Sequence, residues 1–339
     1  MKNKLDYKKA GVDIDAGEKA VELIKPLAKS TFTKNVVADI GSFGAMYKLD
    51  LHRWSHPILV SSTDSVGTKV HIANMMNKWD TVGQDIVNHC VNDILTQGAF
   101  PLFFLDYIGI GKVVPEHVQE IVRGISIACK ENECTLIGGE LAEMPSLYKV
   151  GDFDLVGTIV GCVEEDNVIS GSEIYAGDIL LGFSSTGLHT NGYTLARKIV
   201  FELMELNPDS YIDELQDTIG EVLLTVHRSY YMELKSFILQ RKLKGIAHIT
   251  GGGIKGNLKR IIPDGLTAVI DTTAWDIPPL FSLLQKGGNV ETDEMFRAFN
   301  MGIGLIVVVD QAHVQDVLDD SDAFVIGSIK NGEEKVQLI

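Results

Sequence analysis

The chain has 339 residues, of which 45% are hydrophobic and 22% charged, so it is long enough for two globular domains with separate cores. Its 46 acidic and 30 basic residues give a net charge of −16, which opposes broad binding to nucleic acids or anionic membranes. No apolar run approaches the ~20 residues of a membrane span, and the four cysteines contain no C-x-x-C pair, which favours buried, reduced thiols in a cytoplasmic protein.

The N-terminal half alternates helical and extended patterns. Apolar spacing predicts helices over 15–29, 80–98 and 115–131. Apolar runs predict strands over 36–40, 57–63, 101–108 and 153–163. The strands are long, partly alternating and close together in sequence. We therefore predict an α/β fold with a mixed sheet packed against helices, rather than a doubly wound parallel sheet.

Turn residues over 170–178 interrupt this pattern, and we place the domain boundary there, between residues 1–170 and 171–339. The second half again mixes both element types. Strands are predicted over 179–184, 245–250, 266–271, 302–309 and 323–329, and helices near 192–206, 217–241, 254 onward, 278–298 and 311–319. The absence of a sequence repeat excludes solenoids and propellers.

Two glycine-rich turns in the second half each carry a histidine. Residues 187–194 contain His189 and Asn191, and residues 248–253 begin with His248. Glycines let the backbone approach a ligand closely, and amides at a helix start attract phosphate. An isolated histidine is more often structural than catalytic, but these settings favour the catalytic reading. The two turns predict an enzyme that holds a phosphorylated small molecule beside two imidazoles.

The predicted helix over 80–98 has a polar face of unusual composition. Asp85, Asn88, His89 and Asn92 lie opposite its apolar side, with Asp93 at the border. Such a face is ordinarily solvated. Asparagines are poor helix formers compared with the Lys and Glu of most solvated faces, however. The composition suits a metal- or phosphate-facing surface better.

Two further carboxylates follow predicted strands. Asp64 lies in a segment with two threonines and Lys69, which suits Mg²⁺ and nucleotide phosphates as well as an ordinary capped turn. Glu140 follows two glycines. Its carboxylate either points at a bound cation or lies on the surface without a ligand. With Asp93 these two residues would complete a three-carboxylate Mg²⁺ cluster, because such groups need a cation to offset their repulsion.

A glycine-bearing loop, residues 41–47, follows the predicted strand over 36–40. It matches neither the Walker A pattern nor G-x-G-x-x-G. It is either a mobile phosphate cover or a plain turn, and any ATP site in this chain must be of an unusual kind.

Several of these segments, in order along nearly the whole chain, resemble the phosphoribosylformylglycinamidine cyclo-ligase (aminoimidazole ribonucleotide synthetase) family of purine biosynthesis. The resemblance rests on residues 7–17, 63–69, 90–93, 101–107, 138–145, 187–194, 248–253 and 299–304. It implies a homodimer whose N-terminal domains build a shared β-barrel, with ATP bound near that interface. It also implies ATP-dependent cyclisation of formylglycinamidine ribonucleotide to aminoimidazole ribonucleotide.

The resemblance further implies roles for individual residues. Asp64, Asp93 and Glu140 would hold Mg²⁺–ATP, with Lys69 beside the phosphates and Lys25 near the nucleotide. The mobile loop over them would consist of Gly41, Ser42, Phe43, Gly44 and Ala45. The substrate and its protons would be handled by His189, Asn191, His248, Gly251, Gly252 and Gly253, with the two histidines as catalytic residues.

The chain departs from the family pattern at a few positions. Ser65 replaces a usual glycine, Leu141 a threonine and His89 a common methionine, while Gly256 and Lys259 stand where glutamate and proline are usual. None of these removes a proposed metal ligand or either turn histidine.

Two other readings are less favoured, because the chain carries both histidine turns and all three acids. The first is a relative of the same architecture that phosphorylates another acceptor, such as thiamine phosphate kinase, selenophosphate synthetase or a hydrogenase maturation factor. The second is a catalytically silent nucleotide-binding or assembly protein.

Overall fold

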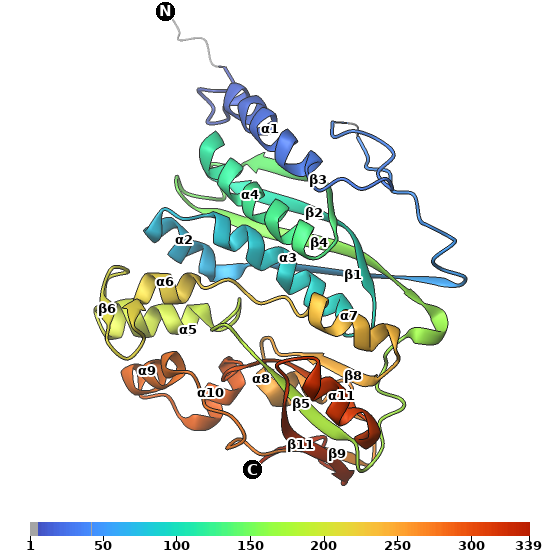
Figure 1. Cartoon of the computed structure of the whole chain (residues 1–339). Helices are drawn as coiled ribbons and strands as arrows, with labels where there is room; N and C mark the ends of the chain where they lie inside the picture. The colour runs from blue at the N-terminus through green and yellow to red at the C-terminus, as the bar shows by residue number, and fades with distance from the viewer. Residues whose placement is uncertain (1–5, 42) are drawn as a thin grey trace, which may run out of the picture.

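The computed structural model describes residues 6–41 and 43–339, so Ser42 of the predicted loop lies outside the described residues. The chain forms two mixed sheets, each packed with helices, which lie one above the other in Figure 1. Each sheet combines antiparallel pairs with one parallel pair. The predicted α/β fold with a mixed sheet in each half is confirmed.

The N-terminal half is a four-stranded sheet with helices on one face. Its strands, in spatial order, are β1 (Pro57–Ser65), β4 (Phe153–Glu164), β2 (Phe100–Ile110) and β3 (Thr135–Glu143). Its helices are α1 (Ile14–Lys29), α2 (Val70–Met76), α3 (Asp80–Leu95) and α4 (Pro115–Glu131). α3 and α4 approach closely because both carry glycine at the crossing. A Cβ on Gly83 would lie 2.1 Å from the carbonyl oxygen of Ile121.

The C-terminal half is built on a six-stranded sheet. Its strands, in spatial order, are β12 (Val336–Leu338), β9 (Leu266–Ile270), β11 (Phe324–Asn331), β5 (Ile179–Ser184), β10 (Ile303–Val309) and β8 (Leu243–His248). Its helices are α5 (Tyr193–Arg197), α6 (Ile219–Leu224), α7 (Tyr231–Leu239), α8 (Gly253–Leu258), α9 (Pro279–Gly288), α10 (Thr292–Ala298) and α11 (Val314–Asp319). A small hairpin pairs β6 (Tyr211–Ile212) with β7 (Asp217–Thr218). The strand β10 is buried at every position, although it lies next to the edge strand β8.

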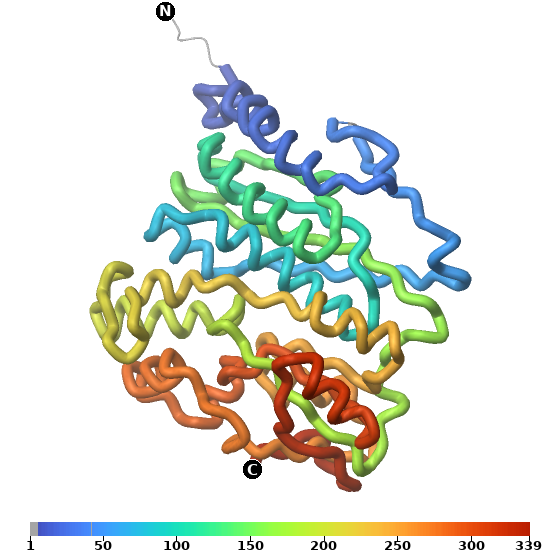
Figure 2. Tube along the Cα trace, in the orientation of Figure 1, coloured from blue at the N-terminus to red at the C-terminus, as the bar shows by residue number. Residues whose placement is uncertain are grey.

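The segment that carries α5, α6 and α7 lies between the two sheets. Figures 1 and 2 show this yellow-green to orange part of the chain running beneath α2 and α3. Met76 of α2 packs against Gly220 of α6, where an added Cβ would lie 2.4 Å from the Met76 sulfur. The two halves therefore meet through α3 on one side and the α6–α7 segment on the other.

The prediction of one helix near 217–241 is wrong. The chain forms α6 and α7 there, separated by residues 225–230, which form neither helix nor strand. Side chains of α3 bond the backbone of this segment. The amide of His227 donates to Asp85 Oδ1 at 2.7 Å, and Asn92 bonds both the carbonyl of Arg228 and the amide of Tyr230. These bonds replace the intrahelical bonds that a continuous helix would make.

Other predicted elements change in detail. Residues 36–40 form no strand, although Val36 pairs with Tyr47 in an isolated bridge and Ile40 is also a bridge residue. The helix near 192–206 is α5 followed by a π-helical turn, Lys198–Leu203. The helix near 278–298 divides into α9 and α10. No helix within the described residues has the length and apolar character needed to cross a membrane.

Candidate functional site

The polar face of α3 is buried at the junction of the two halves. Asp85 and Asn92 have no exposed surface, and Asn88 and His89 are at most 4% exposed. Asn88 donates to the carbonyl of His227 at 2.7 Å and accepts from Asn132 at 2.8 Å. The ordinary reading of this face as solvated is wrong. The Asp and Asn side chains of this face form hydrogen bonds with backbone groups of the C-terminal half, which accounts for its composition.

Lys69 is buried in an ion pair with Asp85 at this junction. Neither side chain is exposed, and the ammonium lies 2.7 Å from Asp85 Oδ2 and 2.7 Å from the carbonyl oxygen of Thr225. The expectation that Lys69 contacts phosphate is therefore corrected, because its ammonium is turned inward and already bonded. A buried charge is tolerated only when it is paired and hydrogen-bonded in this way.

Four histidines gather beside this ion pair. His227 was assigned no role from the sequence, yet it lies at the centre of the group. Its ring stacks on that of His189, with centroids 4.0 Å apart, and its Nε2 lies 3.1 Å from His248 Nε2. His89 joins through Thr190, whose hydroxyl oxygen lies 2.6 Å from His89 Nδ1 and 3.3 Å from His227 Nδ1. The irregular segment at 225–230, which the sequence pattern did not reveal, places His227 there.

His189 has an unpartnered polar atom within this group. The amide of Thr186 donates to His189 Nε2 at 3.1 Å, so that nitrogen is the acceptor and Nδ1 carries the proton of the neutral ring. Burial lowers the His189 pKa well below its usual value, which favours this neutral form. Nδ1 is buried and has no hydrogen-bond partner among the described residues. It is a buried donor whose hydrogen-bonding capacity is unused among the described residues.

The two predicted histidine turns lie side by side. An added Cβ on Gly251 would sit 3.4 Å from Asn191 Oδ1, and Asn191 Nδ2 is buried without a partner among the described residues. Gly253 adopts a φ of +62° and leaves no room for a side chain, because its Cβ would meet the Phe296 carbonyl oxygen at 1.8 Å. Glycine at this position is thus required by packing.

The carboxylates Asp64 and Asp93 face the imidazoles. Asp64 Oδ2 lies 2.9 Å from His89 Nε2, and Asp93 Oδ1 lies 2.8 Å from His248 Nδ1. Burial opposes ionisation of Asp64, but the hydrogen bond and charge of His89 outweigh it and hold the Asp64 pKa below its usual value. The Asp93 pKa is lowered in the same way by His248, despite burial. Both groups are therefore carboxylates at neutral pH.

Glu140 does not join these two carboxylates within one chain. Asp64 pairs with Gly157, Gly157 with Asp106 and Asp106 with Gly139, so Glu140 lies three strands away from Asp64. At ~4.8 Å per strand the separation is roughly 14 Å. The predicted three-carboxylate cluster is therefore wrong for a single chain.

Glu140 belongs to a second location, at the β3 edge of the sheet. A cavity of about 370 Å³ lies there between α1, α4, β2 and β3. Its lining includes the predicted residues Gly41, Phe43, Gly44, Ala45 and Glu140. Asp106 also lines it, and burial raises the pKa of this carboxyl to about 7. Sequence reasoning missed Asp106, although it lies in one of the segments that carry the family resemblance.

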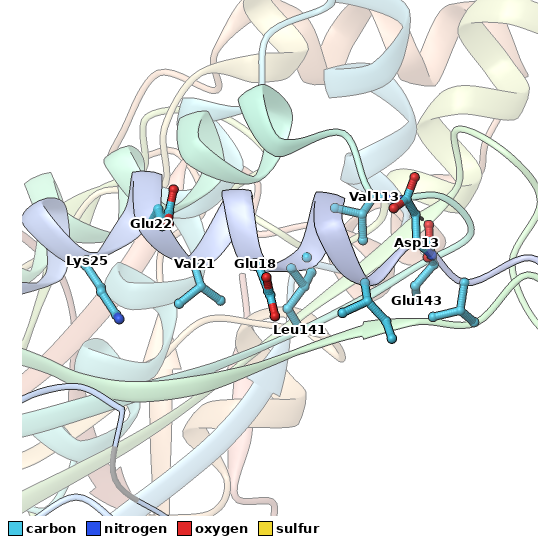
Figure 3. A pocket seen from close by; sticks show the side chains of 11 residues that line it. Asp13, Glu18, Val21, Glu22, Lys25, Val113, Leu141 and Glu143 are labelled. Atoms are coloured by element: carbon cyan, nitrogen blue, oxygen red, sulfur yellow. Dashed lines mark hydrogen bonds between the residues drawn. The ribbon is translucent and has the colours of Figure 1, made fainter. Parts of the chain in front are cut away.

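Lys25 lies in an adjoining groove of about 520 Å³ along α1, which shares Val21 and Leu141 with the cavity. Figure 3 shows Lys25 at one end of this groove and the contact between Asp13 and Glu143 at the other. Glu143 accepts the amide of Val113 at 2.8 Å and that of Asp13, so it anchors the start of α1. The residues predicted to hold ATP thus divide between this location and the domain junction.

Comparison with known proteins matches each half of the chain to a domain of one protein family. Residues 45–163 match the model for the AIR synthase related protein, N-terminal domain, and residues 175–339 match the corresponding C-terminal domain. The phosphoribosylformylglycinamidine cyclo-ligase of Alkaliphilus metalliredigens (strain QYMF) is 48% identical over 340 residues, covering 99% of this chain and 98% of the relative.

Two solved structures of lower identity share the fold. The thiamine-monophosphate kinase of Stenotrophomonas maltophilia K279a superposes with a TM-score of 0.67 at 15% identity, over 94% of this chain and 95% of the kinase. The hydrogenase maturation protein HypE in complex with ATP superposes with a TM-score of 0.62 at 17% identity, over 92% and 86% of the two chains.

Proposed function

The chain belongs to the phosphoribosylformylglycinamidine cyclo-ligase family, and we propose that the two histidine turns at the domain junction bind its ribonucleotide substrate. The enzyme uses ATP to cyclise formylglycinamidine ribonucleotide to aminoimidazole ribonucleotide, with release of ADP and phosphate. ATP phosphorylates the formyl amide oxygen, which turns a poor leaving group into a good one. An amidine nitrogen then attacks that carbon and closes the imidazole ring as phosphate leaves.

The observation that carries this proposal is the pair of unpartnered donors in the first turn. His189 Nδ1 and Asn191 Nδ2 are buried and have no partner among the described residues. A buried donor without an acceptor costs about 1–3 kcal/mol, so a ligand that supplies acceptors removes that cost. The amide and phosphate oxygens of the substrate are acceptors of this kind. Gly251, beside Asn191, leaves space for them.

His248 is the residue that we propose to accept the proton released on ring closure. Asp93 fixes the orientation of its ring through Nδ1, 2.8 Å from the carboxylate. A carboxylate in this position stabilises the imidazolium that forms when the ring takes up a proton. His189, held neutral by burial, is instead proposed to donate a hydrogen bond to the substrate.

ATP is proposed to occupy the cavity beneath α1, where Gly41, Phe43, Gly44 and Ala45 form one wall. The HypE protein that binds ATP shares this fold, which supports a nucleotide site in it. Magnesium is expected with the ATP phosphates. The carboxylates of one chain do not fit the predicted site for it, however, because Asp64 and Asp93 each face an imidazole and Glu140 lies at the opposite edge. We assign no catalytic step to magnesium.

We propose that two copies associate through the sheet face that α3 and α4 leave uncovered. Leu59 on this face is 62% exposed, and Phe43 near the cavity is fully exposed. A barrel that joined β1 of one copy to β3 of the other would bring a second Glu140 towards Asp64. Sedimentation velocity should show a dimer, and Leu59→Lys should shift it towards monomer. A wild-type monomer at micromolar concentration would contradict this.

We place the enzyme in the cytoplasm.

The first test is ADP release from ATP with and without formylglycinamidine ribonucleotide, followed together with formation of aminoimidazole ribonucleotide. Substrate-dependent ADP release that matches imidazole formation one to one is the expected result. ATP binding without turnover of this substrate would instead favour a relative with another acceptor or a silent nucleotide-binding protein.

Asp93→Asn tests the role of the junction carboxylate. The variant should lose most of its ATP-dependent turnover, by about 100-fold or more, because the amide cannot stabilise a charged His248 ring. Circular dichroism should remain that of the wild type, since Asn retains the acceptor for Ser62 at 2.8 Å. Near-normal turnover in this variant would remove Asp93 from the catalytic site.

A further inference from the structure

Asp106 lies in the wall of the cavity beneath α1, where a glycine makes room for its carboxyl group. In the sheet it pairs with Gly139 of β3 on one side and with Gly157 of β4 on the other. A Cβ on Gly139 would lie 2.1 Å from Asp106 Oδ1, so the carboxyl group leans over this glycine. Any side chain at position 139 would displace it. The carboxyl group is therefore held on the β3 side of β2, and it lines the cavity.

No other side chain within residues 6–41 and 43–339 neutralises or bonds this carboxyl group. Burial is the main influence on its pKa, and a contact with its own backbone is the only other one. Asp106 nevertheless keeps some accessible surface as part of the cavity lining. Its hydrogen-bonding groups are thus directed at the space that a ligand would fill.

The rest of the lining is mostly apolar. Side chains of α1, α4 and β3 form much of it: Val21, Ile24, Val118, Val122, Leu136 and Ile137. No lysine, arginine or histidine of the described part of the chain lines the cavity, which disfavours phosphate groups there. The base of a nucleotide therefore suits the cavity, and its phosphates belong outside.

Few titratable groups face Asp106. Glu140 of β3 and Asp39 at the rim are the other carboxyl groups of the lining, and α1 contributes no titratable group to it. Cys129 of α4 lies near Asp106, but burial raises its pKa well above the usual value and keeps the thiol neutral. Protonation of Asp106 is thus governed by burial and not by a neighbouring cation.

A protonated carboxyl group matches one edge of adenine. It offers an O–H donor and a carbonyl acceptor side by side. Adenine carries the N1 acceptor next to the N6 amine, which is a donor, so the two groups can form two hydrogen bonds. An ionised carboxylate has acceptors only, and it would repel the N1 lone pair. It would suit guanine better, because guanine has adjacent donors at N1 and at the N2 amine.

We propose that Asp106 recognises the adenine base of ATP, with its O–H donating to N1 and its carbonyl oxygen accepting from the N6 amine. The inference rests on the proposed ATP site and names the side chain that reads the base there. Burial raises the pKa of Asp106 to about 7, so the protonated form is available at neutral pH. An apolar setting that keeps a carboxylic acid protonated, so that it can donate a hydrogen bond, serves the same purpose in other enzymes.

The test measures nucleotide affinity of the full chain by calorimetry with Mg²⁺ at pH 6 and pH 8. The affinity of the wild type for ATP should fall about tenfold between these values, because the protonated fraction of Asp106 falls from about 90% to about 10%. GTP has the same phosphates and therefore corrects for their titration, and its affinity should not fall. An ATP-to-GTP affinity ratio that is equal at both pH values would overturn the proposal.

Variants and an ATP analogue locate the effect. Asp106→Asn keeps one donor and one acceptor but cannot ionise, so its ATP affinity should be equal at pH 6 and pH 8. Asp106→Leu has neither group and should bind ATP at least tenfold more weakly than the wild type at pH 6. Purine riboside triphosphate, which lacks the N6 amine, should also bind the wild type more weakly than ATP. Asp39→Asn is the matched control at the rim of the cavity and should keep the wild-type pH dependence. Wild-type pH dependence in Asp106→Asn would show that another group reads the base.

Photolabelling separates a failure of this inference from a failure of the proposed ATP site. 8-Azido-ATP should label residues of α1 or β3, identified by peptide mass spectrometry. Labelling confined to other elements would overturn both the ATP site and the role of Asp106. Labelling of α1 or β3, together with unchanged ATP affinity in Asp106→Leu, would overturn the role of Asp106 alone.

Discussion

The domain junction and the cavity beneath α1 differ in the partners that they give to carboxyl groups. At the junction each carboxylate has a cationic or imidazole partner: Asp85 pairs with Lys69, Asp64 with His89 and Asp93 with His248. In the cavity Asp106 has no ion-pair partner among the described residues, and burial raises its pKa to about 7. The Asp64 and Asp93 pKa values are lowered instead. The pKa of Asp85, which has no exposed surface, is raised by burial despite Lys69, so partners outweigh burial only at the less buried Asp64 and Asp93.

This difference indicates what each region can receive. The junction already holds fixed charges, and its unpartnered groups are the donors His189 Nδ1 and Asn191 Nδ2. It therefore suits a ligand rich in acceptors. The cavity combines apolar walls with one carboxyl that is readily protonated near neutral pH, so it suits a largely uncharged group such as a nucleotide base.

Lys69→Met should cause the largest loss of stability. It leaves Asp85 buried without its cation, and breaking a buried pair in this way costs about 3–5 kcal/mol. Urea unfolding measures the effect. Lys78→Met is the matched control, because its pair with Glu221 has the same 2.7 Å distance but side chains that are 41% and 39% exposed. That change should cost at most about 1 kcal/mol. Unchanged stability with lost ATP affinity would restore Lys69 as a phosphate ligand.

Gly253→Ala should have the next largest effect, because it tests the packing of the second histidine turn. The added methyl group meets the Phe296 carbonyl oxygen at 1.8 Å, on a backbone with φ of +62°. We expect a loss of roughly 2–4 kcal/mol in unfolding free energy. Gly256→Ala, three residues later in α8, has open space around its Cβ and should be neutral or stabilising by about 0.4–1 kcal/mol. Equal losses in both variants would show that helix fraying, not the turn, is responsible.

Much of the fold could be predicted because it depends on local patterns. The periodicity of α1, α3 and α4 and the apolar runs of β1, β2 and β4 report burial directly. The break between α6 and α7 could not be predicted in this way. The backbone of residues 225–230 is bonded by Asp85, Asn88 and Asn92, which lie about 140 positions earlier in the chain, and no local pattern records such bonds.

The site was predictable only in part for the same reason. The glycines of the two histidine turns made these turns recognisable in the sequence. The structure brings His189, Asn191 and Gly251 together. The charges of Lys69 and Glu140 suggested that these residues bind phosphate and Mg²⁺. The sequence does not show, however, in which direction a charged side chain points. Strand order places Glu140 at the far edge of the sheet, and the 3-10 turn Gly67–Lys69 turns the lysine inward. His227 had no signal of its own, because its neighbours in sequence are not its neighbours in space.

Asp106→Asn should change how stability depends on pH, and its effect is smallest at acid pH. The folded-state pKa of Asp106 is raised from 3.8 to about 7, so its contribution to stability is complete below pH ~4 and is lost as pH rises through 7. Relative to the Asn variant, the wild type should lose about 1 kcal/mol for each pH unit between 4 and 7, measured by urea unfolding. Asp39→Asn is the control at the rim of the same cavity. Lys29 lowers the Asp39 pKa, so any contribution it makes is lost in the opposite direction, as pH falls. If the wild type and Asp106→Asn keep parallel stability profiles from pH 4 to 7, Asp106 is solvated or paired, and the contrast between the cavity and the junction fails.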